Sequence, residues 1–464
     1  MPVSERPKPY LVPEYCKGCG RCVSVCVKGC IAYDGEINPA TGVVPVILDL
    51  EKCNGCGLCI EACPEPYGLR ALAQGEDYEL QDPSKLFGAR ATAAPEPVEI
   101  PDQNIPMPSS QPLVIKGNYA AALGALLAGC RHVYGYPITP STEGAELMAK
   151  LMPKLDGVFL QAVSEVATVN HMYGTGGAGL PCLTFTSSPG FSLMLEGISY
   201  MVGAEVPAVF VNVMRGGPGL GNIAPEQADI KLACRGLGHG NSQAISLVPS
   251  TPQEMLDLTM LAFELSFKYR NPVMVLADGY LGQMTGKVTL PDHLVKPGIP
   301  AWAVYGDRLH RRNLISSIYL DERDLEKHNE FLNRKYEAMQ VEARSESFLC
   351  EDAEVILVAC NTPARASKGA VQELRHQGIK AGLFRPITVW PFPVKQLAEH
   401  LQTGQRLLVV EASAGQLEDE LRLALSKAGL ATPEIGHVRR MGGMLPGQQE
   451  IMEAAKAFAL GVSR

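Results

Sequence analysis

The chain has 464 residues, a formal net charge of −8 and 46% hydrophobic residues. Domains usually hold roughly 100 to 200 residues, so this length predicts about three of them. An acidic chain without a basic stripe argues against a nucleic-acid partner, and no apolar run reaches the roughly 18 residues that cross a bilayer. We therefore expect a soluble, cytoplasmic protein that binds neither nucleic acid nor membrane.

Cysteine spacing is the strongest signal in the sequence. Nine of the 14 cysteines lie between Cys16 and Cys63, and eight of these nine form two runs with the same x2-x2-x3 spacing. In bacterial ferredoxins such runs hold two 4Fe-4S clusters, and the last cysteine of each run binds the cluster of the other run. The spacing thus predicts one cluster on Cys16, Cys19, Cys22 and Cys63, and a second cluster on Cys53, Cys56, Cys59 and Cys26.

Two alternatives stay open in this segment. Structural zinc also uses Cys-x2-Cys pairs, although four ligands per site would not explain the duplicated eight-cysteine spacing. Cys26 is followed by Val27 rather than by proline, and Cys30 is near enough to replace it as a ligand. Glycines that let the backbone approach a cluster closely are Gly18, Gly20, Gly55 and Gly57. Residues 1–74 resemble a two-cluster ferredoxin, a small α+β domain.

Beyond this segment the patterns predict two α/β domains. Residues 75–110, rich in proline, serine and acid, predict a linker. Strand and helix patterns alternate over 111–292, which predicts a doubly wound parallel sheet covered by helices. A charged, helix-like connecting arm is expected over 293–347 and a second α/β domain over 348–464. In that last domain we expect Cys350 and Cys360 to be packing residues.

Loops rich in glycine, proline and hydroxyl residues follow several predicted strands, where α/β sheets bind ligands. They read GYPITPSTE (135–143), SSPG (187–190) and RGGPGLGN (215–222). Together with SEVATVN (164–170) and LFRPITVWPFP (383–393), they resemble the α subunit of the 2-oxoacid:ferredoxin oxidoreductases. The resemblance implies a thiamine-diphosphate domain of the pyrimidine-binding type, followed by a transketolase C-terminal-like domain. It also implies an enzyme that oxidatively decarboxylates a 2-oxoacid, reduces 4Fe-4S clusters and forms acyl-coenzyme A.

The resemblance assigns the cofactor to particular residues. Glu165 would share a proton with the pyrimidine ring of thiamine diphosphate. The loop residues Tyr136, Pro137 and Ile138 would lie against the same cofactor. Taken without the resemblance, a glutamate on an apolar helix is more readily explained as a surface charge or as a buried salt-bridge partner.

The resemblance also assigns residues that bind the substrate. Thr139 and Arg215 would bind the keto oxygen and the carboxylate of the 2-oxoacid, because a planar guanidinium can hold a carboxylate with two parallel bonds. The alternative for Arg215 is a structural ion pair with Glu226 or Asp229. The loop around Arg215 favours a branched-chain acid such as 2-oxoisovalerate. Phenylglyoxylate and 2-oxoglutarate remain alternatives, as do an electron-transfer adaptor and a non-redox thiamine decarboxylase.

The chain has no Gly-Asp-Gly motif, since Asp278 follows alanine. Thiamine enzymes hold the diphosphate through Mg²⁺ bound at that motif, so the resemblance implies that a partner β subunit carries the Mg²⁺ and the diphosphate half of the site. A γ subunit is also expected. The electron acceptor would be an external ferredoxin or an NAD-reducing subunit.

Overall fold

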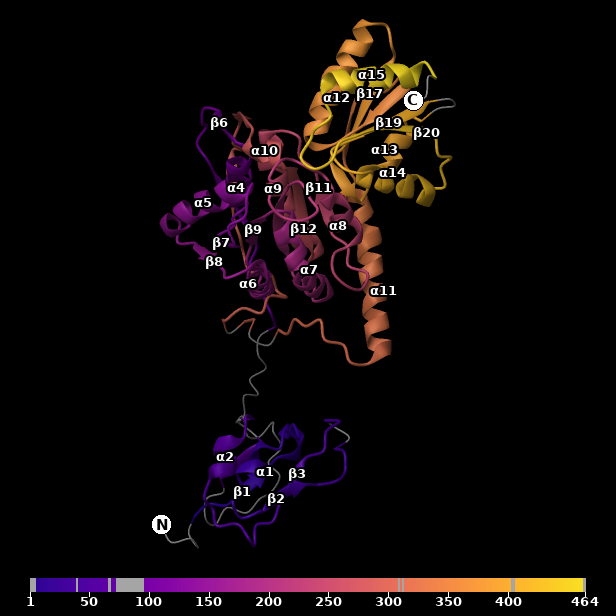
Figure 1. Cartoon of the computed structure of the whole chain (residues 1–464). Coiled ribbons are helices and arrows are strands. Elements are labelled where there is room, and N and C mark those ends of the chain that lie inside the picture. Colours follow the sequence, from indigo (N-terminus) through magenta and orange to yellow (C-terminus); the bar gives the residue numbers. More distant parts are fainter. Residues whose placement is uncertain are drawn as a thin grey trace. The chain divides into compact units, whose positions relative to one another are not determined.

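The structure is a computed structural model that describes residues 6–38, 41–65, 68–71, 96–307, 309–310, 313–401 and 405–461. The chain divides into two compact units, Met1–Ala93 and Ala94–Arg464 (Figure 1). Within the described ranges, every helix is too short or too polar to cross a membrane.

The first unit is a small α+β domain. Strand β1 pairs with β4 and strand β2 pairs with β3, both antiparallel, and the two short helices pack against each other. Only a few apolar side chains, such as Ile31, Val46 and Leu69, join the cysteines in its core, so we expect bound metal to supply much of its stability. The elements are β1 (Pro9–Leu11), η2 (Pro13–Tyr15), α1 (Arg21–Val25), β2 (Ile31–Tyr33), β3 (Val46–Leu48), α2 (Leu58–Ala62) and β4 (Leu69–Ala71).

The larger sheet of the second unit has seven described strands in the order β18-β11-β12-β10-β9-β7-β8, and all but β18 are parallel. Strands β10 and β12 are buried at every residue because helices cover both faces. The elements are α4 (Gly117–Leu127), β7 (His132–Gly135), α5 (Thr142–Leu151), η3 (Met152–Lys154), β8 (Val158–Gln161), α6 (Glu165–Gly177), β9 (Cys182–Thr186), α7 (Ser188–Gly203), β10 (Ala208–Met214), α8 (Asp229–Arg235), β11 (Ile245–Leu247), α9 (Pro252–Tyr269), β12 (Pro272–Asp278) and α10 (Gly279–Gln283).

The register of this sheet places the predicted site loops at one edge. Met214 at the end of β10 pairs with Asp278 at the end of β12, and Thr186 at the end of β9 pairs with Asn212. Since carboxyl ends of parallel strands share one edge of a sheet, the loops after β7, β9, β10 and β12 gather there.

A second sheet of five described strands has the order β15-β17-β16-β19-β20. Helices α12 and α15 cover one face, and α13 and α14 lie on the other (Figure 1). The elements are β15 (Ser345–Phe348), β16 (Val355–Val358), α12 (Asn361–His376), β17 (Ala381–Pro386), β18 (Thr388–Trp390), α13 (Val394–Ala398), β19 (Arg406–Glu411), α14 (Gln416–Lys427), β20 (Glu434–Arg439) and α15 (Gln448–Ala459). The predicted doubly wound parallel sheet and second α/β domain are thus confirmed. Strand β18, however, leaves the second domain and pairs with β11 of the first.

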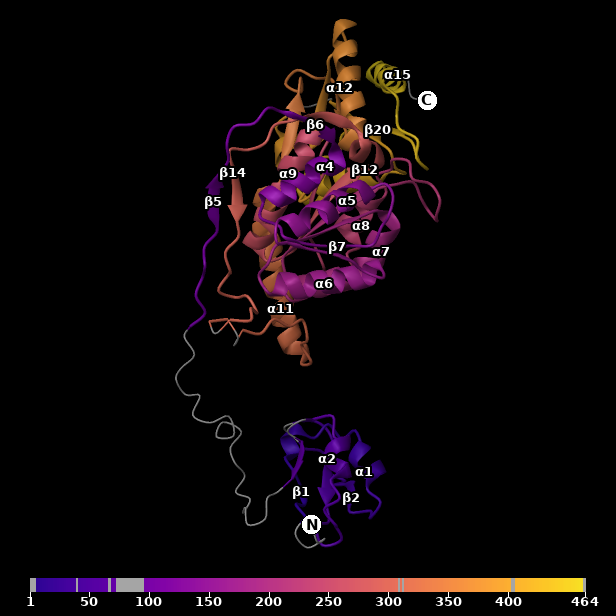
Figure 2. The ribbon, with the colours of Figure 1, turned by 90° about the vertical axis from the view of Figure 1, so that its left-hand side faces the viewer.

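The expected linker contains a paired strand, and the expected connecting arm is helical over part of its length. Residues 75–95 of the linker lie outside the described residues, but β5 (Gln103–Pro106) pairs with β14 (His293–Lys296), and the two run side by side in Figure 2. Strand β6 (Leu113–Lys116) pairs with β13 (Thr285–Val288). Among the described residues of the arm, the helices are α11 (Glu322–Ala338) and η4 (Met339–Glu342).

Gln227 joins the two α/β domains. It is fully buried, and its amide nitrogen donates to the Cys360 carbonyl at 3.2 Å and to Asn361 Oδ1 at 3.0 Å. Its amide oxygen accepts from the Ala412 N–H at 2.8 Å. Cys360 is therefore buried, as expected, but takes part in a polar contact rather than in purely apolar packing.

Replacing Gln227 should loosen this contact. Gln227→Met keeps a similar side-chain volume but leaves the buried Ala412 N–H without an acceptor, so we expect the free energy of unfolding to fall by about 2 to 4 kcal/mol in a denaturant titration. Gln372→Met, on the exposed side of α12, is the control and should change it by less than about 0.5 kcal/mol. An unchanged midpoint for Gln227→Met would show that the amide does not join the domains.

Candidate functional site

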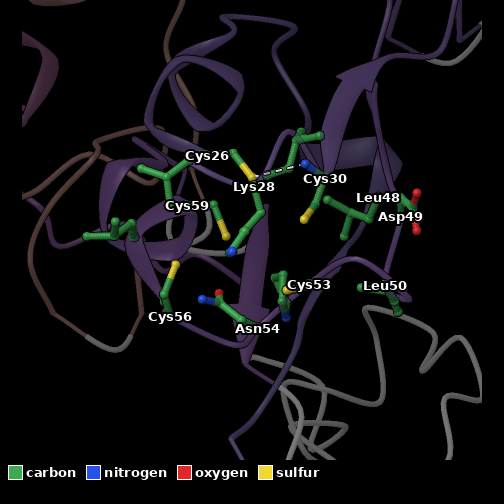
Figure 3. Close-up of a pocket in the computed structure, with 15 residues that line it drawn as sticks. Cys26, Lys28, Cys30, Leu48, Asp49, Leu50, Cys53, Asn54, Cys56 and Cys59 are labelled. Carbon is green, nitrogen blue, oxygen red and sulfur yellow. Dashed lines mark hydrogen bonds between the residues drawn. The ribbon is translucent and has the colours of Figure 1, made fainter. Parts of the chain in front are cut away.

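Two pockets in the first unit separate the eight run cysteines into two sets. One pocket is lined by Cys16, Cys19, Cys22 and Cys63, and the other by Cys26, Cys53, Cys56 and Cys59, with Cys30 beside them. Figure 3 shows the five cysteines of the second pocket around one space. These are the two sets that the cysteine spacing predicts.

Glycines shape both cysteine loops in the same way. Gly18 and Gly55 have φ of 62° and 66°, a left-handed conformation that side chains disfavour. Gly20 and Gly57 are also left-handed, and they are the N-cap residues of α1 and α2. Each helix then buries one cysteine and ends at the last cysteine of its run. Helix α1 buries Cys22 and ends at Cys26, and helix α2 buries Cys59 and ends at Cys63.

The thiols surround a space rather than converge on a point. Among the described residues, no three histidine, cysteine, aspartate or glutamate side chains lie close enough together to hold one mononuclear ion. A zinc ion draws four ligands onto one centre, whereas a 4Fe-4S cluster takes each thiolate on a separate iron. Each pocket brings together four run cysteines, the number of thiolates that one 4Fe-4S cluster takes.

Cys26 and Cys30 differ in their environment. Burial raises the pKa of the Cys30 thiol to about 11. Burial acts in the same direction on Cys26, but hydrogen bonds from neighbouring backbone groups outweigh it and lower the pKa of that thiol. One of them runs from the Cys30 N–H to Cys26 Sγ at 3.2 Å, dashed in Figure 3. The thiolate that iron needs is therefore favoured at Cys26.

Thr139 and Arg215 meet at the carboxyl edge of the seven-stranded sheet. Thr139 lies in the loop after β7 and Arg215 directly follows β10. Arg215 Nη1 donates to the Thr139 carbonyl at 2.7 Å, and the Arg215 N–H donates to Ser188 Oγ at 3.1 Å. Arg215 Nε is buried and has no hydrogen-bond partner within the described part of the chain. The guanidinium thus keeps an unsatisfied donor for an incoming group.

The alternative role of Arg215, an ion pair with Glu226 or Asp229, is not seen among the described residues. Glu226 Oε2 accepts from the Gly217 N–H at 2.8 Å, and Asp229 Oδ2 accepts from Asn212 Nδ2 at 2.8 Å. Neither carboxylate forms an ion pair with Arg215 in this part of the structure. Burial raises the pKa of both carboxyl groups.

Glu165 is the first residue of α6, and Ser164 caps that helix by accepting from the Ala167 N–H at 3.3 Å. The Glu165 side chain is buried, with 6% of its surface exposed, and it forms no hydrogen bond or ion pair with any described residue. It is therefore not a surface charge, and it has no salt-bridge partner among the described residues. Gly190 faces it, since a Cβ on Gly190 would lie 2.5 Å from Glu165 Oε1.

Ser188 and Gly190 belong to the SSPG loop that the sequence places near the ligand, but the sequence analysis gave neither residue a role. Both lie in the first turn of α7, one beside Arg215 and the other against Glu165. The available signal was the glycine directly after the helix-initiating Pro189, where a missing side chain leaves room for a neighbour. The first turn of α7 therefore lies between the two predicted parts of the site.

The loop residues expected at the cofactor lie just before Thr139. Tyr136 and Pro137 are exposed and Ile138 is half-buried. Asp278, compared above with the metal-binding motif, is buried and engaged otherwise. Its Oδ1 accepts from the Leu281 N–H at 2.9 Å, and its Oδ2 accepts from the Thr362 N–H at 2.8 Å.

A pocket opens beside Arg215 where the two α/β domains meet. The glycine-rich loop forms one wall, and Asn222 Nδ2 of that loop donates to the Gly442 carbonyl of the second domain at 2.7 Å. Among the described lining residues Arg215 is the only cation. The lining includes Ser188, Arg215, Leu220, Glu226, Asp229 and Met441.

Comparison with known proteins agrees with this arrangement of domains. Residues 123–347 match the family described as pyruvate flavodoxin/ferredoxin oxidoreductase, thiamine diphosphate-binding, and residues 353–451 match core domain II of pyruvate:ferredoxin oxidoreductase. Residues 15–66 match the 4Fe-4S dicluster domain. The fold and site therefore define a thiamine-dependent oxidoreductase that carries iron-sulfur clusters.

Individual relatives narrow the family. The chain is 45% identical to ketoisovalerate oxidoreductase subunit VorB of Methanothermobacter marburgensis, over 75% of this chain and 97% of the relative. It is 36% identical to 2-oxoglutarate synthase subunit KorA of Methanocaldococcus jannaschii, over 73% and 98%. The chain thus belongs to the 2-oxoacid:ferredoxin oxidoreductases, enzymes that use thiamine diphosphate and 4Fe-4S clusters.

A solved structure has the same fold. It is the 2-oxoglutarate:ferredoxin oxidoreductase from Magnetococcus marinus with 2-oxoglutarate, coenzyme A and succinyl-CoA bound, and it is 26% identical with a TM-score of 0.67. The match covers 75% of this chain but only 65% of that chain.

Proposed function

We propose that this chain is the α subunit, fused to its own ferredoxin-like segment, of a coenzyme A-acylating oxidoreductase for branched-chain 2-oxoacids. One observation carries the proposal: Arg215, with an unsatisfied buried donor, meets Thr139 beside the helix turn that faces the unpaired Glu165. The relative named ketoisovalerate oxidoreductase supports the substrate class, and the coenzyme A-bound relative supports the acyl acceptor. In the reaction a 2-oxoacid and coenzyme A give acyl-coenzyme A, CO₂, a proton and two electrons.

Glu165 is proposed to bind the aminopyrimidine ring. Thiamine diphosphate, when bound, supplies a nucleophilic carbon and takes up the negative charge left by decarboxylation. Glu165 would share a proton with the ring nitrogen N1′, since its carboxylate has no other described partner. The space that a Gly190 Cβ would fill leaves room beside that carboxylate. Tyr136, Pro137 and Ile138 are proposed to line the same cofactor.

Arg215 and Thr139 are proposed to orient the 2-oxoacid. Arg215 Nε can donate to the carboxylate while Nη1 keeps its bond to the Thr139 carbonyl. The Thr139 hydroxyl is exposed and can donate to the keto oxygen, which draws electrons from the carbon under attack. Holding both ends of the acid would set the direction from which the keto carbon is approached.

The eight thiols are proposed to hold the two clusters that accept the electrons one at a time. The first cluster takes Cys16, Cys19, Cys22 and Cys63, and the second takes Cys53, Cys56, Cys59 and Cys26. A β subunit would carry Mg²⁺ and the diphosphate, because Asp278 is engaged in the fold. We also infer a γ subunit, a cytoplasmic location, and a ferredoxin or an NAD-reducing subunit as acceptor.

The pocket beside Arg215 is proposed to receive the side chain of the substrate. Leu220 and Met441 offer apolar surface, whereas Glu226 and Asp229 are carboxyl groups without a second cation among the described lining residues. A 2-oxoacid with a second carboxylate would meet like charge there, which disfavours 2-oxoglutarate. The pocket therefore supports an uncharged side chain, as in 2-oxoisovalerate.

The decisive experiment is an assay of the anaerobically purified native complex with a panel of 2-oxoacids and a viologen acceptor. We expect coenzyme A-dependent reduction with branched-chain acids, and a loss of at least about 100-fold for Glu165→Gln in the assembled complex. A wild-type rate for Glu165→Gln would indicate an electron-transfer adaptor. Preference for phenylglyoxylate would move the substrate to arylglyoxylates, and aldehyde release without acceptor would indicate a decarboxylase.

Charge in the side-chain pocket should control selectivity. Glu226→Gln removes a negative charge beside Arg215, so we expect the kcat/KM ratio of 2-oxoglutarate to 2-oxoisovalerate to rise about tenfold. Burial raises the pKa of Glu226, so the ratio is measured at several pH values, and the difference between the variant and wild type should grow as the pH rises and the wild-type group loses its proton. The exposed Glu373→Gln on α12 serves as the charge-matched control. An unchanged ratio would place the substrate side chain elsewhere.

Metal analysis tests the two cysteine sets. Cys22→Ala should lower the iron content from about eight to about four atoms per chain, because one 4Fe-4S cluster is lost. Cys30→Ala should keep about eight. If Cys30→Ala also drops to about four, Cys30 and not Cys26 is the fourth ligand. Zinc in place of iron in the anaerobic wild-type chain would favour the structural zinc alternative.

A further inference from the structure

In the loop that carries Thr139, side chains donate hydrogen bonds to three successive main-chain carbonyls, those of residues 138 to 140. Ser141 Oγ donates to the Ile138 carbonyl at 2.8 Å, although Ser141 occupies the N-cap position of α5 and serine hydroxyls there usually cap the helix. Arg215 Nη1 donates to the Thr139 carbonyl at 2.7 Å. The Pro140 carbonyl accepts from two amides. The Thr139 hydroxyl, by contrast, has no partner among the described residues and is exposed.

Those two amides belong to Asn118 and Gln283. Asn118 Nδ2 lies 2.8 Å from the Pro140 carbonyl oxygen and Gln283 Nε2 lies 3.2 Å from it. Both amides also donate to Glu143 Oε2, at 3.0 Å and 2.6 Å. The start of α4, the end of α10 and the start of α5 are therefore joined behind the loop.

Lys116 sets the orientation of this network. Its Nζ donates to Gln283 Oε1 at 3.0 Å and to Glu143 Oε1 at 3.1 Å. Because the lysine holds the amide oxygen of Gln283, the NH₂ group of that amide must face Glu143 and Pro140. Asn118 is fully buried, so its amide is also confined to one arrangement. A network that is ordered by an ion pair resists rotation of the loop.

We propose that Asn118 and Gln283 are positioning residues for 2-oxoacid binding, which act through the Pro140 carbonyl to hold the Thr139 hydroxyl and the Arg215 guanidinium in register. The proposal rests on the function proposed above. The amides touch neither substrate nor cofactor. They fix the one loop whose carbonyl is bound by Arg215, so loss of the amides would let Thr139 and Arg215 shift together.

The test uses the native complex with Gln283→Met, Asn118→Leu and the double variant. Each single change keeps a similar side-chain volume, adds no charge beside Glu143, and removes one donor to Pro140 and to Glu143, so we expect KM for the 2-oxoacid to rise about three- to tenfold. The double variant should raise it by about the product of the two factors or more. The KM for coenzyme A and the iron content should stay close to wild type.

Gln253 provides a matched control. Its Nε2 also bridges a carboxylate, Asp257 Oδ1 at 2.9 Å, and a main-chain carbonyl, that of Thr289 at 3.1 Å, but on α9. Gln253→Met, which also removes an amide donor without adding charge, should leave the KM for the 2-oxoacid unchanged.

Two results would overturn the proposal. One is a wild-type KM in the double variant, and the other is a lower thermal midpoint with unchanged kinetics per iron-loaded complex, which is a purely structural role. Failure of the proposed function is seen separately, as a wild-type complex that oxidises none of the 2-oxoacids.

Discussion

The buried carboxylate of Asp278 is the interaction on which the second unit depends. It stands at the carboxyl end of the central strand β12, accepts the Leu281 N–H at the start of α10, and accepts both the N–H and the hydroxyl of Thr362 from the second domain. Burial raises the pKa of this carboxyl group, while the hydrogen bonds favour its charged form. A buried charge is tolerated only when it is so fully bonded, which fixes both α10 and the domain contact.

The position of α10, which Asp278 fixes, in turn affects the candidate site. Helix α10 ends at Gln283, whose amide reaches the loop that carries Thr139. On the other side of the edge, the loop after Arg215 is held by Asn222 to the second domain. The second α/β domain therefore helps to shape the pocket beside Arg215, to which it contributes Met441 and Gly442. The packing of the two α/β domains therefore also determines the geometry of the candidate site.

Part of the fold and of the candidate site could be predicted from short stretches of the sequence. The apolar strands 207–214 and 272–278 and the repeated cysteine spacing each depend on neighbours in the sequence. The pairing of β18 with β11 and of β5 with β14 was not predictable, because these short strands lack periodicity and their partners are distant. The unpaired state of Glu165 and Arg215 likewise depends on which carboxylates and amides the fold brings near. Spacing along the chain carries no information about that.

The pairing of β18, from the second domain, with β11 of the first domain affects the order in which the chain can fold. Strand β11 is an edge strand until Thr388–Trp390 covers it, and these residues leave the ribosome more than a hundred residues after β12. An uncovered edge strand is a template for pairing with other chains. The nascent first domain therefore stays open to aggregation until β18, which lies within the second domain, has emerged, and a chain truncated between the domains would keep that edge exposed.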